Sequence, residues 1–170
     1  MIALLFLLIQ LFLAGFFLYL CIAFMTGGPF VPTRNSSVDA MIRVAGIRNG
    51  MTVVDLGSGD GRVLLAAARE GAYAVGFEIN PYLVWYTRLR AFLSPQRGMI
   101  SVYWKNLWRA DISRADIVFV YLIPWRMKEL AGILNRQLKP GSLVISNSFI
   151  FPDWKVIRKD TVNHIYVYRL

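Results

Sequence analysis

The first 25 residues of the chain carry no charged side chain. From Ile2 to Met25, 16 of the 24 residues are Leu, Ile, Phe or Val, and only Gln10 and Gly15 interrupt the apolar run. A helix of about 20 apolar residues is long enough to cross a bilayer. Insertion free energies of about −0.3 to −0.6 kcal/mol for each such residue outweigh the cost of Gln10. The sequence therefore predicts a transmembrane anchor over residues 1–26.

The apolar run lacks the features of a cleaved signal peptide. Such a peptide needs a basic segment before a short apolar core and a small-x-small cleavage site, whereas no Lys or Arg precedes this run and it ends in Cys21–Met25. We therefore favour an uncleaved anchor over a signal peptide or a buried helix of a water-soluble protein. Arg34, Arg43 and Arg48 follow the run, and positively charged flanks stay on the cytoplasmic side. The sequence thus predicts a single-pass membrane protein whose C-terminal part faces the cytoplasm.

All the charged side chains follow the apolar run. From Arg34 onward, 19 Lys and Arg stand against 10 Asp and Glu, which gives a net charge of +9. Roughly 145 residues remain after the run, enough for one domain with a single core. Cys21 is the one cysteine and His164 the one histidine. This composition excludes a disulfide scaffold, a cysteine nucleophile in the domain and a histidine-rich metal site, so we expect no metal.

Strand and helix patterns alternate through the rest of the chain. Strand patterns lie at 52–56, 72–78, 99–104, 116–121, 142–147, 154–159 and 163–169, and helical patterns at 36–46, 62–70, 81–92 and 124–138. This alternation predicts an α/β fold with a parallel sheet covered on both faces, ending in an antiparallel hairpin. We expect a linker over residues 27–34 and one domain over residues 35–170.

A glycine-rich turn follows the first of these strands. Gly57, Gly59 and Gly61 alternate with other residues, which lets the chain turn sharply and lets backbone N–H groups approach a ligand without a Cβ in the way. Ligands of parallel α/β sheets bind beyond the carboxyl ends of the strands. Glu78 stands at the tip of the next strand, 21 residues after Gly57. A carboxylate in that place can accept both hydroxyls of an adenosine ribose.

The details of this turn indicate which kind of adenosine ligand it takes. Its spacing is G-x-G-x-G, not the G-x-G-x-x-G that brings a helix N-terminus to a pyrophosphate. The acidic Asp55 just before the turn favours a cationic group over a phosphate. A ligand with ribose hydroxyls, no phosphate and an amino-bearing tail fits both carboxylates, and S-adenosylmethionine is such a ligand. The alternative is an ordinary strand–helix turn with incidental acidic residues.

Four motifs together resemble a known family. They are PFVPT at 29–33, DLGSGDGR at 55–62, GFEINPYLVWYTRLRA at 76–91 and NLW at 106–108. Over roughly residues 28–155 the chain resembles the seven-β-strand lysine methyltransferases that include the mitochondrial ATP synthase c-subunit and adenine nucleotide translocase enzymes. The resemblance implies a class I methyltransferase fold, a Rossmann-like doubly wound seven-stranded sheet, here preceded by one transmembrane helix.

The resemblance also implies a set of cofactor-binding residues. These are Asp55, Gly57, Ser58, Gly59 and Gly61 around the methionine part, Glu78 and Ile79 at the ribose, and Asn106 and Leu107 at the adenine. The chain departs from the family at Asn106, where the family has an Asp that accepts a bond from the adenine amino group. An amide oxygen can still accept this bond, but without the stronger charge-assisted interaction.

Residues for the methyl acceptor follow from the same resemblance. Tyr121 and Pro124 after the fourth strand and Asn147 after the fifth are the candidate catalytic residues. Candidate substrate or lid residues are Trp154 and the linker segment Phe30, Val31, Pro32 and Thr33. Aromatic residues near this mouth could instead belong to the core, and the linker could instead be a rigid spacer.

The function expected from these features is S-adenosylmethionine-dependent N-methylation of lysine in a membrane or membrane-associated protein. Methyl transfer is an in-line displacement that depends mainly on alignment and exclusion of water, so it requires neither a metal nor a covalent nucleophile. A small-molecule or lipid (quinone-type) methyltransferase and an inactive S-adenosylmethionine-binding membrane adaptor remain alternatives. We disfavour nucleic acid, because the domain lacks a cysteine and the fourth strand lacks an Asn/Asp-Pro-Pro-aromatic turn. The basic surface is better suited to anionic membrane lipids.

Overall fold

The chain forms two compact units, Met1–Phe30 and Val31–Leu170. The computed structural model describes residues 2–26, 28 and 30–170. Three residues of the predicted anchor and linker, Met1, Gly27 and Pro29, lie outside the described residues. We describe each unit by itself.

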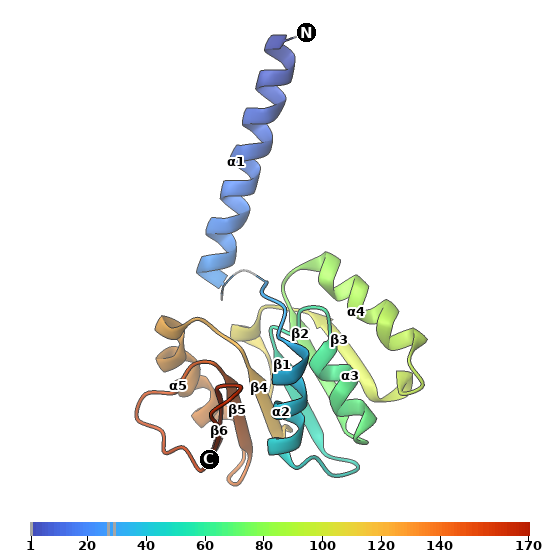
Figure 1. Cartoon of the computed structure of the whole chain (residues 1–170), viewed down its shortest axis with the longest axis vertical. Coiled ribbons are helices and arrows are strands. Elements are labelled where there is room, and N and C mark those ends of the chain that lie inside the picture. Colours follow the sequence, from blue (N-terminus) through green and yellow to red (C-terminus); the bar gives the residue numbers. More distant parts are fainter. Residues whose placement is uncertain (1, 27, 29) are drawn as a thin grey trace. The chain divides into compact units, whose positions relative to one another are not determined.

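The first unit consists mainly of the long helix α1 (Ile2–Thr26), so the predicted N-terminal helix is confirmed (Figure 1). Large apolar side chains such as Leu4, Phe12 and Phe17 are exposed along it. In the part of the chain that the structure describes, no helix has the combination of length and hydropathy that crossing a membrane requires. The predicted membrane crossing of this segment is therefore not confirmed.

The second unit contains a seven-stranded sheet, as predicted. Its strands are β1 (Thr52–Leu56), β2 (Tyr73–Glu78), β3 (Ile100–Trp104), β4 (Ile117–Val120), β5 (Leu143–Asn147), β6 (Arg158–Asp160) and β7 (Ile165–Arg169). Their order in the sheet is β3-β2-β1-β4-β5-β7-β6. The first five strands run parallel, whereas β7 is antiparallel to both β5 and β6. This arrangement confirms the doubly wound sheet with an antiparallel hairpin at one end.

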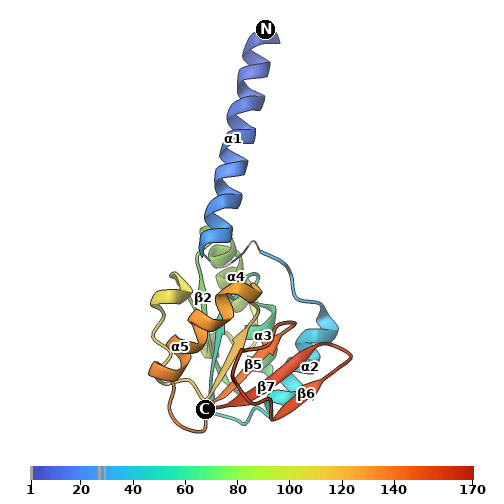
Figure 2. The same cartoon turned by 90° about the vertical axis from the view of Figure 1, so that its left-hand side faces the viewer.

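Helices cover both faces of the sheet, as Figure 2 shows for α2 and α5. The helices of this unit are α2 (Asn35–Ala45), α3 (Arg62–Arg69), α4 (Pro81–Leu93) and α5 (Met127–Gln137), with short 3₁₀ turns η1 (Arg97–Met99), η2 (Leu107–Arg109) and η3 (Pro124–Arg126). Side chains of α2, α3 and α4 pack with one face of the strands in one core cluster. Side chains of α5 pack with the other face in a second cluster. The strands are apolar on both sides because both faces are covered.

Two elements differ from the predicted ranges by more than two residues at one end. The helix predicted at 124–138 is divided into η3 and α5, because Pro124 opens a 3₁₀ turn before the α-helix begins at Met127. The strand predicted at 154–159 is only Arg158–Asp160. Trp154, in the part of that range which is not a strand, instead stacks on Phe151 with ring centroids 4.4 Å apart.

Candidate functional site

The glycine-rich turn lies between the carboxyl end of β1 and the start of α3. Gly57, Gly59 and Gly61 have φ values of +86°, +53° and +75°, a region that residues with a Cβ adopt only at a cost. The backbone N–H groups of Gly57 and Ser58 donate to the carbonyl oxygen of Phe77, at 2.9 and 3.1 Å. The turn is therefore fixed against the carboxyl end of β2, where the sequence places Glu78.

The Glu78 side chain is buried and held by two backbone donors. The N–H of Gly59 donates to its Oε2 at 2.9 Å, and the N–H of Asn80 donates to its Oε1 at 2.8 Å. Each carboxylate oxygen has more than one lone-pair site, so both can accept further bonds from a ligand. The structure thus brings Glu78 into direct contact with the glycine-rich turn, as the sequence predicts.

Asp55 is the second buried carboxyl group of the site. Burial, the charge of Glu78 and the charge of Asp60 raise the pKa of Asp55 from 3.8 to about 7. A carboxyl group in such surroundings is costly to ionise unless a cation comes close to it. This surplus of negative charge at the end of β1 suits a ligand with a positively charged group.

One further observation indicates room for a ligand beside the turn. A Cβ placed on Gly57 would meet no atom within 4 Å. Open space next to a backbone turn, beside two buried carboxyl groups, is where a small molecule can bind. The Oγ of Ser58, which has no hydrogen-bond partner among the described residues, lies instead over Gly76 of β2, where an added Cβ would come within 2.6 Å of it.

Asn106 and Leu107 lie where β3 ends and η2 begins. The Oδ1 of Asn106 accepts the N–H of Trp108 at 3.1 Å and so caps η2. Its second lone pair and its amide group remain for a ligand. Ile79 follows Glu78 and its side chain is exposed, while its carbonyl oxygen accepts the indole N–H of Trp104 at 2.9 Å. These residues follow the ends of β2 and β3, as expected for one ligand site.

Helix α4 holds the glycine-rich turn through residues that the sequence motifs did not indicate. Thr87 donates its hydroxyl to the carbonyl oxygen of Gly59 at 2.9 Å. Arg90 donates to the carbonyl oxygen of Asp60 at 2.5 Å and lies 3.5 Å from its carboxylate. A sequence signal for Thr87 exists, because it is a polar residue at the buried helical position between Val84 and Ala91.

Asp60, within the glycine-rich turn, forms a charged cluster with Arg62 and Arg90. The guanidinium of Arg62 pairs with the Asp60 carboxylate at 2.7 Å and also donates to the carbonyl oxygen of Thr33. Burial acts to raise the pKa of Asp60, but the hydrogen bonds and charge of Arg62 and the charge of Arg90 outweigh it and lower the pKa. Asp60 therefore stays ionised and fixes both arginines. Thr33, one of the predicted lid residues, is attached to the turn through Arg62.

The predicted acceptor residues lie at the ends of β4 and β5. Tyr121 is partly exposed and stacks on Phe149, with ring centroids 6.4 Å apart. Asn147 is buried at the end of β5, where its Oδ1 accepts the hydroxyl of Ser148 at 3.0 Å. Pro124 is exposed at the start of η3. Because the carboxyl ends of parallel strands lie at one edge of the sheet, these residues share that edge with Asp55.

The remaining predicted residues have different surroundings. Trp154 packs against Phe151 and edge-on against Tyr168, the latter with centroids 5.6 Å apart, and lies partly buried against the second core cluster. That packing accounts for Trp154 as a partly buried side chain at the margin of the core, and its contact with substrate stays a prediction. Phe30, Val31 and Pro32 are exposed, and their role as a lid also stays a prediction.

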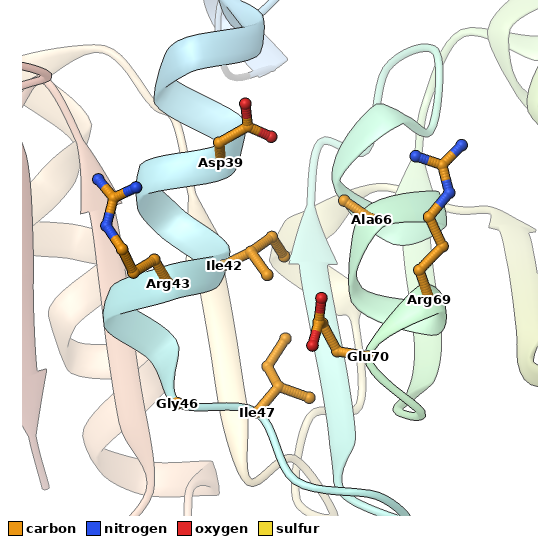
Figure 3. A pocket seen from close by; sticks show the side chains of 8 residues that line it. All are labelled: Asp39, Ile42, Arg43, Gly46, Ile47, Ala66, Arg69 and Glu70. Carbon is orange, nitrogen blue, oxygen red and sulfur yellow. The ribbon is translucent and has the colours of Figure 1, made fainter.

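A groove of about 400 Å³ lies elsewhere on the domain, between α2 and α3 (Figure 3). Ile42, Ile47 and Ala66 contribute apolar surface to it, while Asp39, Arg43, Arg69 and Glu70 contribute charges of both signs. The groove includes the C-terminal ends of both helices, at the amino edge of the sheet, and none of the predicted site residues lines it. It is therefore separate from the candidate site.

Comparison with known proteins agrees with the geometry of the site. Residues 55–158 match the model of the ANTKMT methyltransferase domain. The chain belongs to this methyltransferase family. The family implies S-adenosylmethionine as cofactor, and the space at Gly57 and the two buried carboxyl groups fit it. The predicted family and cofactor are thus confirmed.

Individual relatives extend the match. The chain is 40% identical over 126 residues to the mouse lysine N-methyltransferase of the ATP synthase c-subunit, and the match covers 74% of this chain and 51% of the relative. It is 32% identical over 148 residues to a protein-lysine N-methyltransferase of Saccharolobus islandicus, covering 82% and 92% of the two chains. The chain therefore spans about half the length of the mouse relative and nearly all of the archaeal one.

A solved structure has the same fold. An RNA methyltransferase from Salinibacter ruber, in complex with S-adenosyl-L-homocysteine, is 38% identical and superposes with a TM-score of 0.77 over 82% of this chain and 92% of its own. The class I methyltransferase fold of Val31–Leu170 is therefore established.

Proposed function

We propose that the chain is an S-adenosylmethionine-dependent protein-lysine N-methyltransferase. The observation that carries the proposal is the pair of buried carboxyl groups, Asp55 and Glu78, on either side of the Gly57–Gly61 turn. Membership of the methyltransferase family and similarity to relatives named as lysine methyltransferases support it.

The cofactor would be held mainly by groups that the fold has already oriented. Glu78, fixed by the N–H groups of Gly59 and Asn80, would accept the ribose hydroxyls. Asp55 would face the amino group of the methionine part, whose positive charge favours the ionised carboxylate. Asn106 and Leu107 would lie at the adenine. The cofactor supplies a methyl group on a sulfonium, which makes the methyl a good target for a neutral amine.

The acceptor would enter beside Tyr121. A lysine amine must lose its proton before it can attack, and an apolar aromatic surrounding lowers its pKa. Tyr121 and Phe149 form such a surrounding at the edge shared with the cofactor turn. Alignment of the amine with the methyl group then contributes most of the acceleration. The partly exposed position of Tyr121 suits the side chain of a macromolecule.

We further propose that the N-terminal segment anchors the enzyme at a membrane, with the methyltransferase unit, Val31–Leu170, on the cytoplasmic side. The uncharged run from Ile2 to Met25 supports anchoring, and Arg34, Arg43 and Arg48 after it support the orientation. The acceptor would then be a membrane or membrane-associated protein, because anchoring restricts the enzyme to that neighbourhood.

The test is mass spectrometry of membrane proteins from cells that have or lack the gene, with the gene returned as wild type, Glu78→Gln or Glu70→Gln. We expect a lysine methyl mark that wild type and Glu70→Gln restore and Glu78→Gln does not, because Glu70 is exposed and away from the turn. A methylated lipid or quinone in place of a lysine would indicate the small-molecule alternative. Calorimetric titration without any cofactor binding would contradict the proposal, and binding without any methylated product would indicate an adaptor.

RNA is a second candidate acceptor, favoured by the 38% identical Salinibacter ruber protein and by the net charge of +9. Basic surfaces bind the phosphate backbone. Incubation of the full chain with radiolabelled S-adenosylmethionine and total RNA or total membrane protein separates the two candidates. Label in nuclease-sensitive material would identify RNA as the acceptor, whereas label in protease-sensitive material would support lysine.

A further inference from the structure

Helix α4 has an apolar outer face in addition to its buried face. The buried positions are Val84, Thr87 and Ala91, which pack toward the sheet. The outer face of α4 comprises Tyr82, Trp85, Tyr86, Leu89, Phe92 and Leu93, whose side chains are 41% to 83% exposed. Their spacing of three and four residues places all six on one side of the helix. A surface helix with one face on the core normally has polar residues on the other, so this face is suited to an apolar surrounding.

The segment around the outer face of α4 carries only positive charge. From residue 79 to residue 110 the chain has five basic residues, Arg88, Arg90, Arg97, Lys105 and Arg109, and no acidic residue. On the helix itself, Arg88 and Arg90 stand on the two borders of the apolar face. Trp104, which is 67% exposed, contacts the start of this segment through the carbonyl oxygen of Ile79.

We propose that the outer face of α4 docks on an anionic lipid surface. Exposed Trp and Tyr beside aliphatic side chains, bordered by arginine, are typical of helices that lie in the membrane interface. Each basic residue near an anionic surface adds to the attraction. A second copy of the chain fits this face less well, since pairing would bring two sets of five positive charges together. The inference rests on the proposed function and deepens it by naming a membrane contact of the catalytic unit.

Docking through α4 would hold the glycine-rich turn, Gly57–Gly61, close to the lipid surface. The inner side of the same helix contacts the turn through the bond from Thr87 to Gly59 and through Arg90 at Asp60. Arg88 holds α4 against β3, a strand at the edge of the sheet, because its guanidinium donates two hydrogen bonds to the carbonyl oxygen of Val102, at 2.8 and 3.0 Å. A rigid connection therefore runs from the apolar outer face to the cofactor-binding residues.

The test uses spin labels on the full chain in vesicles. Cys21 is replaced by Ser, and a label is placed through Phe92→Cys on the outer face of α4 or, as the control, through Val162→Cys in the exposed β6–β7 turn. Vesicles contain phosphatidylcholine alone or with phosphatidylglycerol. Collision of the label with oxygen, which dissolves in lipid, is compared with its collision with a water-soluble nickel chelate.

We expect the label at position 92 to become more accessible to oxygen and less accessible to nickel in phosphatidylglycerol vesicles, with no change at position 162. High salt should weaken this effect, because it screens the arginines. Trp85→Ser with Leu89→Ser should abolish it, whereas Tyr73→Ser, at an exposed tyrosine on β2, should not. Equal exposure to nickel at positions 92 and 162 would refute the inference. Protection of position 92 from both reagents would also refute it, since a protein would then cover the face.

The outcome for α4 is separable from the outcome for the proposed enzyme. The label at position 92 reports the surroundings of α4 alone, whether or not α1 crosses the bilayer. S-adenosylhomocysteine binding is measured by calorimetry on the same labelled samples, because Phe92 lies outside the catalytic machinery. Lipid contact without cofactor binding would reject the proposed function and retain the docking surface. Cofactor binding without lipid contact at position 92 would reject the docking surface and retain the proposed function.

Discussion

At the scale of single residues, the candidate site contains two buried carboxyl groups, Glu78 and Asp55, whose surroundings differ. Glu78 accepts hydrogen bonds from the backbone N–H groups of Gly59 and Asn80. Asp55 is buried beside the negative charges of Glu78 and Asp60, which raise its pKa to about 7. Mutation of Glu78 should therefore act through lost hydrogen bonds to the ligand, whereas Asp55 should also make ligand binding depend on pH.

Glu78→Gln should weaken S-adenosylhomocysteine binding about 10- to 100-fold, because a bond to a charged acceptor contributes about 1.5–3 kcal/mol. The amide also turns an N–H group toward the Gly59 or Asn80 donor. Isothermal titration calorimetry measures the affinity. Glu70→Gln is the control, since Glu70 is exposed at the end of α3, and equal affinity for both variants would contradict the role of Glu78.

Cofactor binding should depend on pH through Asp55. Below about pH 7 the carboxyl group of Asp55 is protonated in the free protein, so a cationic ligand must displace this proton in order to bind. Affinity should rise about tenfold per pH unit up to about pH 7 and level off above it. Calorimetry at pH 6 in two buffers of different ionisation enthalpy should detect about one released proton per bound ligand. Asp55→Asn should lose this release, whereas Asp39→Asn should keep it.

The same raised pKa affects folding stability. The folded protein retains a proton on Asp55 that the unfolded chain, with a pKa of 3.8, releases at a lower pH. The free energy of unfolding should therefore fall between about pH 4 and about pH 7, with no further contribution from Asp55 above pH 7. Asp55→Asn should make urea unfolding less dependent on pH in this range. An unchanged slope would mean that Asp55 titrates normally.

At the scale of elements, the contact between α4 and the glycine-rich turn leaves no room for a side chain at Gly61. A Cβ on Gly61 would collide with the Cγ2 methyl of Thr87, and the φ of Gly61 is +75°. Gly50 has a similar φ of +82° but open space around its Cβ position. An added Cβ at Gly50 therefore costs only the strained backbone conformation, whereas one at Gly61 also costs the collision with Thr87.

Gly61→Ala should destabilise the protein by about 2–5 kcal/mol, the sum of a left-handed backbone and an overpacked contact. Gly50→Ala should cost only about 1–2 kcal/mol, because it has the backbone term alone. Thr87→Ser in the Gly61→Ala background removes the colliding methyl and keeps a hydroxyl for Gly59, so it should restore part of the loss. Urea denaturation provides the three values, and equal costs for the two glycines would rule out the collision.

At the scale of the whole molecule, the first residues of the second unit, 31–36, are held against the glycine-rich turn. Arg62 at the start of α3 contacts both the Thr33 carbonyl oxygen and the Asp60 carboxylate. Thr33 is close to the start of the second unit at Val31. The order of residues 31–36 should therefore depend on the guanidinium group of Arg62.

Arg62→Ala should increase hydrogen exchange in residues 31–36 about 10- to 100-fold, because a hydrogen bond from a charged donor contributes about 1.5–3 kcal/mol. Mass spectrometry of peptic peptides measures the exchange. Arg69→Ala is the matched control, since Arg69 is an exposed arginine at the other end of α3. Unchanged exchange in residues 31–36 would show that other contacts hold the segment.

Much of the fold and the core of the site were predictable because they depend on neighbours in sequence. Alternating patterns predicted the seven strands, and the Asn80 cap and Pro81 predicted the start of α4. The turn residues and Glu78 end adjacent parallel strands, so topology alone brings them together. The ranges at 124–138 and 154–159 were less accurate, because Pro124 and the stacking of Trp154 on Phe151 changed the local geometry.

The sequence by itself determined the uncharged N-terminal run, the order of strands and helices, and the two carboxylates of the site, because each follows from local pattern and spacing. Only the tertiary structure decided that Thr87 and Arg90 hold the glycine-rich turn and that Trp154 packs against the second core cluster. It also decided which side of α4 is exposed. The physical reason is that these contacts join residues distant in the chain, whose meeting depends on how the helices pack on the sheet.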